Sequence, residues 1–255
     1  MNYFIITGTS RGIGEAIARQ VLHKNHCLFC ISRTENQQLL EAARDKQVQL
    51  YSIAYDLNEV YGIEQLMQDI FLKIEKEQID GIFLINNAGV VKPIKPVGRC
   101  QDLEIIQNIH VNLLAPMLLT SEFTKHVRSL QVKKRVFNIS SGAGKKPYHG
   151  WSAYCSAKAG LDLFTQCADL EEEQEAYPVE MLSFAPGIVD TQMQSDIRES
   201  DKNDFTQLER FIDFKESGIL LAPEKVADII IELLLHQQWG KKRVVDIQEY
   251  LVDRE

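Results

Sequence analysis

The chain has few of the features that would place a protein in or across a membrane. None of its apolar runs is long enough to cross a bilayer. The first residues, from Met1 to Gly8, lack the basic start and the long apolar stretch of a secretory signal peptide. We therefore expect a cytoplasmic protein with no membrane partner.

Basic residues are in the minority. The sequence has 28 Lys and Arg against 36 Asp and Glu, which gives a formal net charge of −8. Nucleic acid is not expected as a partner, because binding its phosphates requires a basic surface. A local basic patch could still hold one phosphorylated cofactor.

Cysteine is also scarce, with five residues in the chain: Cys27, Cys30, Cys100, Cys155 and Cys167. The first two form a C-x-x-C, but the motif lies inside the apolar run Cys27-Leu28-Phe29-Cys30-Ile31, which is typical of a buried strand. No second cysteine pair or Cys/His cluster completes a zinc site, so we predict no metal. The pair is interpreted as free buried thiols of a reducing compartment.

No Pro/Gly-rich linker, internal repeat or low-complexity tract divides the chain, so we predict a single domain over residues 1–255. Short apolar runs alternate with helical patterns, which favours parallel pairing with helices on both faces. The prediction is an α/β fold with a doubly wound parallel sheet of about seven strands. Expected strands cover residues 3–7, 27–32, 48–54, 82–85, 135–139, 179–183 and 243–247, and expected helices cover 13–24, 35–46, 59–77, 101–130 and 153–176.

Residues 190–222 depart from this alternation. They are polar, charged and poorly periodic, and they lie between the sixth predicted strand and the last predicted helix. A long segment in that position is typical of a lid over a binding site. The alternative is a solvated surface loop.

A glycine-containing turn follows the first predicted strand and opens the first helix. It reads Thr7-Gly8-Thr9-Ser10-Arg11-Gly12-Ile13-Gly14. Glycines let the backbone turn tightly and approach a ligand, and the helix start offers unpaired N–H groups to a pyrophosphate. The pattern alone is weak, but the strand before it and the helix after it strengthen the prediction. Its Gly-x-x-x-Gly-x-Gly spacing resembles that of the short-chain dehydrogenase/reductase family, which has a Rossmann-type fold.

Two arginines indicate which nicotinamide cofactor would bind. A site for NAD usually has an acidic residue at the end of the second strand, where this chain has Ser32 and Arg33. Arg11, in the glycine turn, can reach the same place. Two guanidinium groups can pair with a 2′-phosphate, so NADPH is favoured over NADH. The alternative is that both arginines are solvated surface residues.

A tyrosine and a lysine, Tyr154 and Lys158, lie one helical turn apart and therefore on one face of a predicted helix. The ammonium is expected to lower the pKa of the tyrosine from about 10, so that its hydroxyl can donate a proton to a carbonyl oxygen. Taken alone, this spacing more often marks an ordinary helix surface.

The family resemblance extends over essentially the whole chain, and it implies roles for further residues. Ser141 would bind the substrate oxygen, and Asn112 would support a water relay to the lysine, although an asparagine there could simply kink or cap the helix. The remaining implied cofactor contacts are Asp56 at the adenine, Asn87, Ala88 and Gly89 after the fourth strand, and Pro186, Gly187, Val189 and Thr191 after the sixth.

The resemblance is closest to the sepiapterin-reductase-like branch, which includes bacterial benzil reductases. It implies an NADPH-dependent reduction of an aromatic ketone or 1,2-diketone to a chiral alcohol. Trp151, His149 and Met193 could form the walls of the substrate pocket. Asp246 matches a pterin-anchoring aspartate or is only a charge at a strand end.

Two other enzymatic activities remain open, reduction of a pterin and reduction of a 3-oxoacyl thioester. A non-catalytic NADPH-sensing protein is the alternative of another class. Retention of the serine, the tyrosine and the lysine disfavours it. The family also implies a homodimer or homotetramer through the helices at 101–130 and 153–176.

Overall fold

Seven short apolar segments form one parallel sheet in the computed structural model, which describes residues 1–236 and 238–251. The strand order is β3-β2-β1-β4-β5-β6-β7, and every neighbouring pair is parallel. The predicted seven-stranded α/β sheet is confirmed. The strands are β1 (Asn2–Thr7), β2 (His26–Ser32), β3 (Gln49–Ala54), β4 (Gly81–Asn86), β5 (Lys133–Ile139), β6 (Glu180–Ala185) and β7 (Val244–Asp246).

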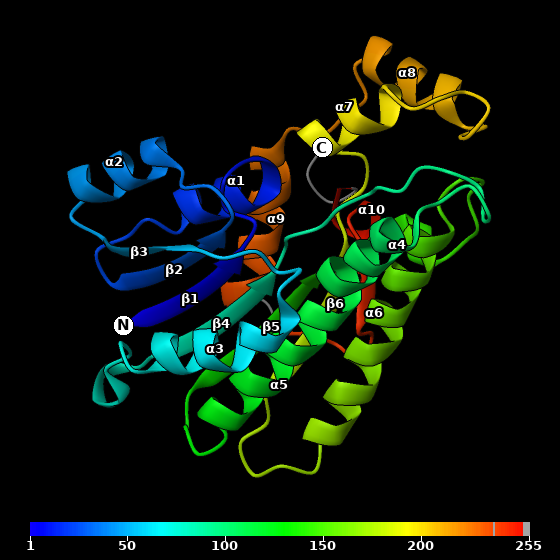
Figure 1. The fold of residues 1–255 in the computed structure, drawn as a ribbon. Coiled ribbons are helices and arrows are strands. Elements are labelled where there is room, and N and C mark those ends of the chain that lie inside the picture. Colours follow the sequence, from blue (N-terminus) through cyan, green and yellow to red (C-terminus); the bar gives the residue numbers. More distant parts are fainter. Residues whose placement is uncertain (237, 252–255) are drawn as a thin grey trace.

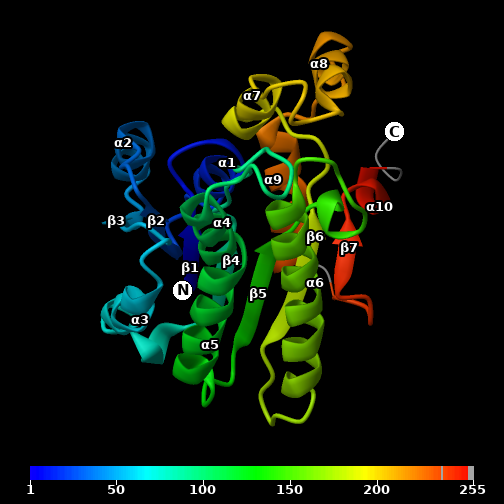
Figure 2. The same cartoon turned by 45° about the vertical axis from the view of Figure 1, so that its right-hand side comes forward.

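Helices cover both faces of the sheet (Figures 1 and 2). One face carries α1 (Gly12–Gln20), α2 (Gln37–Asp45) and α9 (Pro223–Leu235), and the other carries α3 (Ile63–Phe71), α4 (Asp102–Ile109), α5 (Ala115–Val127) and α6 (Ser152–Glu172). Three further α-helices lie in the described residues: α7 (Gln192–Arg198), α8 (Leu208–Glu216) and α10 (Gln248–Leu251). Across the described residues, no helix has both the length and the apolar character to span a bilayer.

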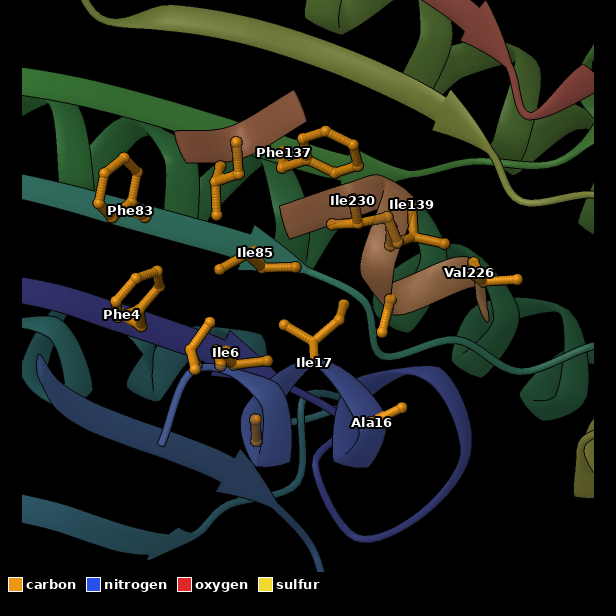
Figure 3. Close-up of a cluster of buried hydrophobic side chains, with 14 of the residues drawn as sticks. Phe4, Ile6, Ala16, Ile17, Phe83, Ile85, Phe137, Ile139, Val226 and Ile230 are labelled. Atoms are coloured by element: carbon orange, nitrogen blue, oxygen red, sulfur yellow. The ribbon is translucent and has the colours of Figure 1, made fainter. Parts of the chain in front are cut away.

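Strand side chains alternate between two hydrophobic cores. Phe4 and Ile6 of β1 pack with α1 and α9, whereas Tyr3 and Ile5 face α3 and α5. Figure 3 shows the first core, where Ile17 of α1 and Ile230 of α9 belong to the same cluster as side chains of the strands. The cysteines of the C-x-x-C follow the same alternation, with Cys27 in one core and Cys30 in the other. Their side chains therefore point to opposite faces of β2, as expected for structural thiols.

Two predicted helices differ from the observed ones. The helix expected at 59–77 is shorter, because a 3₁₀ turn occupies Val60–Gly62 and the α-helix ends at Phe71. The helix expected at 101–130 is interrupted by a π-helical turn at His110–Leu114. Pro116 explains the interruption, since it has no N–H to donate to the carbonyl of Asn112 four residues earlier.

Residues 190–222 contain α7 and α8, which the sequence analysis did not predict. Both helices lie beyond the carboxyl ends of the strands (Figure 2). The two ends of the segment lie side by side, because Asp190 N donates to Leu221 O at 2.9 Å and Leu221 N donates to Ile188 O at 2.9 Å. Phe205 and Phe211 are buried in a third apolar cluster, so the segment is packed rather than a solvated surface loop.

Candidate active site

The glycine turn lies where the sheet order reverses between β1 and β4, which is where ligands bind in doubly wound sheets. Gly8 has φ +76°, in the left-handed region that favours glycine. Gly14 packs beneath the turn, and a Cβ there would lie 2.4 Å from the carbonyl oxygen of Gly8. The start of α1 has no side-chain cap, so its N–H groups remain available for a phosphate.

A long groove of about 580 Å³ follows the carboxyl edge of the sheet. Most of the residues predicted to bind the cofactor line it. These are Gly8, Ser10, Arg11, Gly12, Ile13, Ser32, Arg33, Asp56, Asn87, Ala88, Gly89, Tyr154, Lys158, Pro186 and Thr191. Gly14 supports the turn from below, and Gly187 and Val189 line an adjoining cavity instead.

Both arginines that the sequence predicts to bind a phosphate line this groove. Arg11 and Arg33 are both exposed, and neither forms an ion pair within residues 1–236 and 238–251. Asn36 connects the two loops, because its amide donates to Ser10 O at 3.2 Å and accepts from Leu39 N at 3.0 Å. The arginines therefore present two uncompensated positive charges to the groove.

The groove reaches Tyr154 and Lys158, and Ser141 lines the adjoining cavity beside Tyr154. The first two project from α6 and are 6% and 3% exposed. Lys158 Nζ donates to the carbonyl of Ile139 at 2.8 Å and lies 5.8 Å from the centre of the Tyr154 ring. Ser141 Oγ accepts from Ala143 N at 3.1 Å, so its own hydrogen can point elsewhere.

Burial is the main cause of the pKa shifts of Tyr154 and Lys158. It raises the pKa of Tyr154 to about 12, with hydrogen bonding to Ser141 acting weakly in the opposite direction. Burial likewise lowers the pKa of Lys158 to about 8, against the field of Asp162. The expected lowering of the tyrosine pKa is therefore wrong for the ligand-free protein. Burial deprives a phenolate of the water that would stabilise it, and the ammonium of Lys158 donates to the carbonyl of Ile139.

Asn112 lines neither cavity. Its amide donates to Val90 O at 2.7 Å and to Asn108 Oδ1 at 3.0 Å, and its oxygen accepts from Val90 N at 3.0 Å. The side chain thus holds the segment after β4 in place. Asn112 and Lys158 both approach Gly89, where a Cβ would lie 3.1 Å from Asn112 Oδ1 and 3.8 Å from Lys158 Nζ.

A second cavity, of about 190 Å³, adjoins the groove at Tyr154. Of the predicted substrate residues, Ser141, Trp151, Met193 and Asp246 all line it. The Trp151 ring stacks on Phe205 at 4.8 Å between centroids and meets Tyr154 edge-on at 5.5 Å. The α8 side chains Phe211 and Phe214 form further aromatic walls.

Two residues that the sequence suggested for the substrate pocket need comment. His149 is exposed and lines neither cavity, whereas its neighbour Tyr148 does line the second one. Asp246 lies at the cavity but is already engaged, since Lys145 Nζ is 3.4 Å from its carboxylate and Gln248 N donates to it at 3.2 Å. A substrate that needs a free carboxylate is therefore disfavoured.

Several residues at the site were not predicted from the sequence. Asn108 is fully buried and donates to Lys92 O at 2.7 Å, one helical turn before Asn112. The spacing of two asparagines four apart could have indicated it. Gln194 and Phe211 also line the second cavity, and no local pattern in 190–222 marks them.

Comparison with known proteins gives a consistent picture. Residues 2–202 match the short chain dehydrogenase family. A benzil reductase ((S)-benzoin forming) from Bacillus cereus is 49% identical over 249 residues, which is 98% of this chain and 100% of that protein. A sepiapterin reductase from Rattus norvegicus is 33% identical over 206 residues, 77% of each chain. These similarities confirm the predicted resemblance to the family and its branch.

Solved structures show the same architecture. The crystal structure of the KRED1-Pglu enzyme has a TM-score of 0.82 and 32% identity, and covers 96% of this chain and 100% of that one. A metagenomic short-chain oxidoreductase crystallised in complex with NADP has a TM-score of 0.74 and 25% identity, and covers 96% and 95% of the two chains. The groove described above thus belongs to a fold in which a structural neighbour binds a nicotinamide cofactor.

Proposed function

Since the chain belongs to the short chain dehydrogenase family and is an oxidoreductase of C=O and CH–OH groups, we propose that it is an NADPH-dependent reductase of aromatic ketones or 1,2-diketones. One observation carries the proposal. Tyr154, Lys158 and Ser141 meet at the junction of a phosphate-binding groove and an aromatic cavity.

The described residues fit the nicotinamide cofactor that the family implies. The turn at Gly8 and the uncapped start of α1 suit a pyrophosphate, and Asn87 to Gly89 border the middle of the groove. Arg11 and Arg33 favour a 2′-phosphate, because charge-assisted bonds from guanidinium groups to phosphate are strong. The buried thiols of the C-x-x-C suit the reducing cytoplasm in which we place the protein.

Bound NADPH supplies the hydride that adds to the carbonyl carbon. Ser141 Oγ and the Tyr154 hydroxyl donate to the carbonyl oxygen, and Tyr154 gives up its proton as that oxygen becomes an alkoxide. Lys158 stabilises the phenolate that remains and returns a proton to it. Asn112 fixes the chain beside the lysine, where we place the water relay.

The substrate assignment rests on the second cavity and on the benzil reductase relative. Trp151, Phe211 and Phe214 give the cavity aromatic walls, which suit a substrate that carries aromatic rings. The engagement of Asp246 by Lys145 makes a pterin less favourable, because that carboxylate already has a partner. We place the lid role on residues 190–222, whose α7 and α8 line the cavity.

Two copies of the chain are proposed to associate through α4 and α6. These helices expose apolar side chains that a partner would cover, with Leu103 77% and Leu163 62% exposed. Light scattering on the purified protein tests this proposal, and a monomer at micromolar concentration would contradict it.

The proposed activity is tested by NADPH oxidation with benzil as substrate. We expect turnover with NADPH, weaker turnover with NADH, and a chiral hydroxyketone as product. Tyr154→Phe should lose activity by about a thousandfold or more while still binding NADPH. Tyr61→Phe, at a residue that is 98% exposed, is the matched control and should behave as the wild type. Absence of turnover on a panel of aromatic ketones and diketones would contradict the assignment.

A further inference from the structure

Three side chains that line the second cavity each carry a buried polar atom with no hydrogen-bond partner among the described residues. The atoms are Ser140 Oγ, Trp151 Nε1 and Gln194 Oε1. Such groups are rare, because burial removes their hydrogen bonds to water without replacing them. Ser141 and Asp246, at the same cavity, do have partners, since Ser141 is bonded to Ala143 N and Asp246 to Lys145.

Gln194 is the least expected of the three in its surroundings. It is the third residue of α7, it is 8% exposed, and its side chain lines a cavity walled by Phe211 and Phe214. Ile197, one turn later, lines the same cavity, so the buried side of α7 faces it. An apolar side chain of this size would fill the position without the loss that an unpaired amide carries.

Trp151 and Gln194 differ in what they can bind. The indole N–H is a donor only, whereas an amide offers a donor at one end and an acceptor at the other. Rotation of the terminal amide by 180° exchanges its two ends. Both side chains that line the cavity can therefore donate to a carbonyl oxygen. Ser140 differs from them, because it lies after β5 and also borders the cofactor groove.

We infer that Gln194, assisted by the Trp151 N–H, binds the second oxygen of a 1,2-dicarbonyl while the first oxygen lies at Ser141 and Tyr154. The inference rests on the proposed ketone reduction and names its specificity-determining residue. The enzyme then selects a diketone over a monoketone of the same outline, because only the diketone gives the buried amide a partner.

The test compares two substrates that differ in one oxygen, benzil and deoxybenzoin (1,2-diphenylethanone). Gln194→Met keeps the length of the side chain and removes the amide. We expect it to lower kcat/KM for benzil about tenfold and to leave deoxybenzoin within about twofold. The ratio of the two substrates, compared between variant and wild type, cancels their different intrinsic reactivities.

Two further variants control the result. Gln68→Met makes the same change at an exposed residue of α3, outside both cavities, and should leave the substrate ratio unchanged. Trp151→Phe keeps an aromatic ring and removes the N–H, and should lower the ratio in the same direction. NADPH binding, followed by fluorescence, verifies that each variant is folded.

The outcomes separate this inference from the proposed function. If the wild type reduces neither ketone, the proposed function fails. If it reduces both but Gln194→Met slows them equally, the reduction stands and the inference is overturned. A fall confined to benzil supports the inference.

Discussion

Replacing Lys158 by methionine should stabilise the ligand-free protein at neutral pH while abolishing turnover. The lysine is 3% exposed, and burial lowers its pKa from the ordinary 10.5 to about 8. The unfolded chain, where the side chain is solvated, therefore holds the proton more tightly than the folded protein does. The folded state carries the cost of this difference whenever the lysine is charged.

The magnitude follows from the two pKa values. A gap between 10.5 and about 8 corresponds to about 3 kcal/mol of lost stability at about pH 7. Between those values the unfolded state binds more protons, so wild-type stability rises with pH and the cost falls to about 1 kcal/mol near pH 9.5. Methionine removes this cost but leaves the Ile139 carbonyl without its 2.8 Å partner, a loss of about 1 to 2 kcal/mol that does not depend on pH.

The assay is urea unfolding of both proteins without cofactor, at about pH 7 and about pH 9.5. The variant should be more stable by about 1 to 2 kcal/mol at the lower pH, and its advantage should shrink by about 2 kcal/mol at the higher one. Other titrating groups are common to both proteins and cancel in this comparison. Lys24→Met, at an exposed lysine, should show no such pH dependence. An advantage that is the same at both pH values would refute the reasoning.

Three further predictions follow from single residues. Gly14→Ala should destabilise the protein by about 2 kcal/mol in urea unfolding and weaken NADPH binding, because the new Cβ would lie 2.4 Å from Gly8 O; unchanged stability would contradict the packing. Arg33→Asp should raise KM for NADPH about tenfold or more and leave KM for NADH nearly unchanged, as steady-state kinetics would show. Cys30, whose pKa burial raises to about 12, should resist a thiol reagent in the folded protein while exposed Cys167 reacts; equal reaction rates would contradict this.

The parts of the site that local sequence could predict lie at strand ends or within one helical turn. The conformation of the glycine turn at Gly8 is a local property of its backbone. The pairing of Tyr154 with Lys158 follows from helix geometry. Parallel strands bring their carboxyl ends to one edge, so motifs far apart in the chain meet there. The π turn could also have been predicted from the sequence, because Pro116 follows Asn112 by four residues and cannot donate to its carbonyl.

The parts that local sequence could not predict depend on packing between distant segments. Phe205 and Phe211 occur among polar residues, and their burial follows only from contact with Trp151, more than fifty residues earlier. The same contact encloses Tyr154, which reverses the expected direction of its pKa shift. The sequence spacing identifies which side chains are neighbours. The direction of a pKa shift depends in addition on how fully the surrounding residues bury the group.

The proton state of Tyr154 makes the two directions of the reaction unequal. Reduction begins with a protonated phenol, and a pKa near 12 keeps the hydroxyl protonated throughout the neutral range. Oxidation of the alcohol needs the phenolate, which at about pH 7 is about one molecule in 100,000 in the ligand-free site. Initial rates of oxidation should therefore rise about tenfold per pH unit between about 6 and 8, below the pKa of Lys158 near 8, while reduction changes little over the same range. Above that value the ammonium that stabilises the phenolate is lost, and reduction should decline. Oxidation rates that stay flat over this range would mean that binding of cofactor and substrate overrides the burial of the tyrosine.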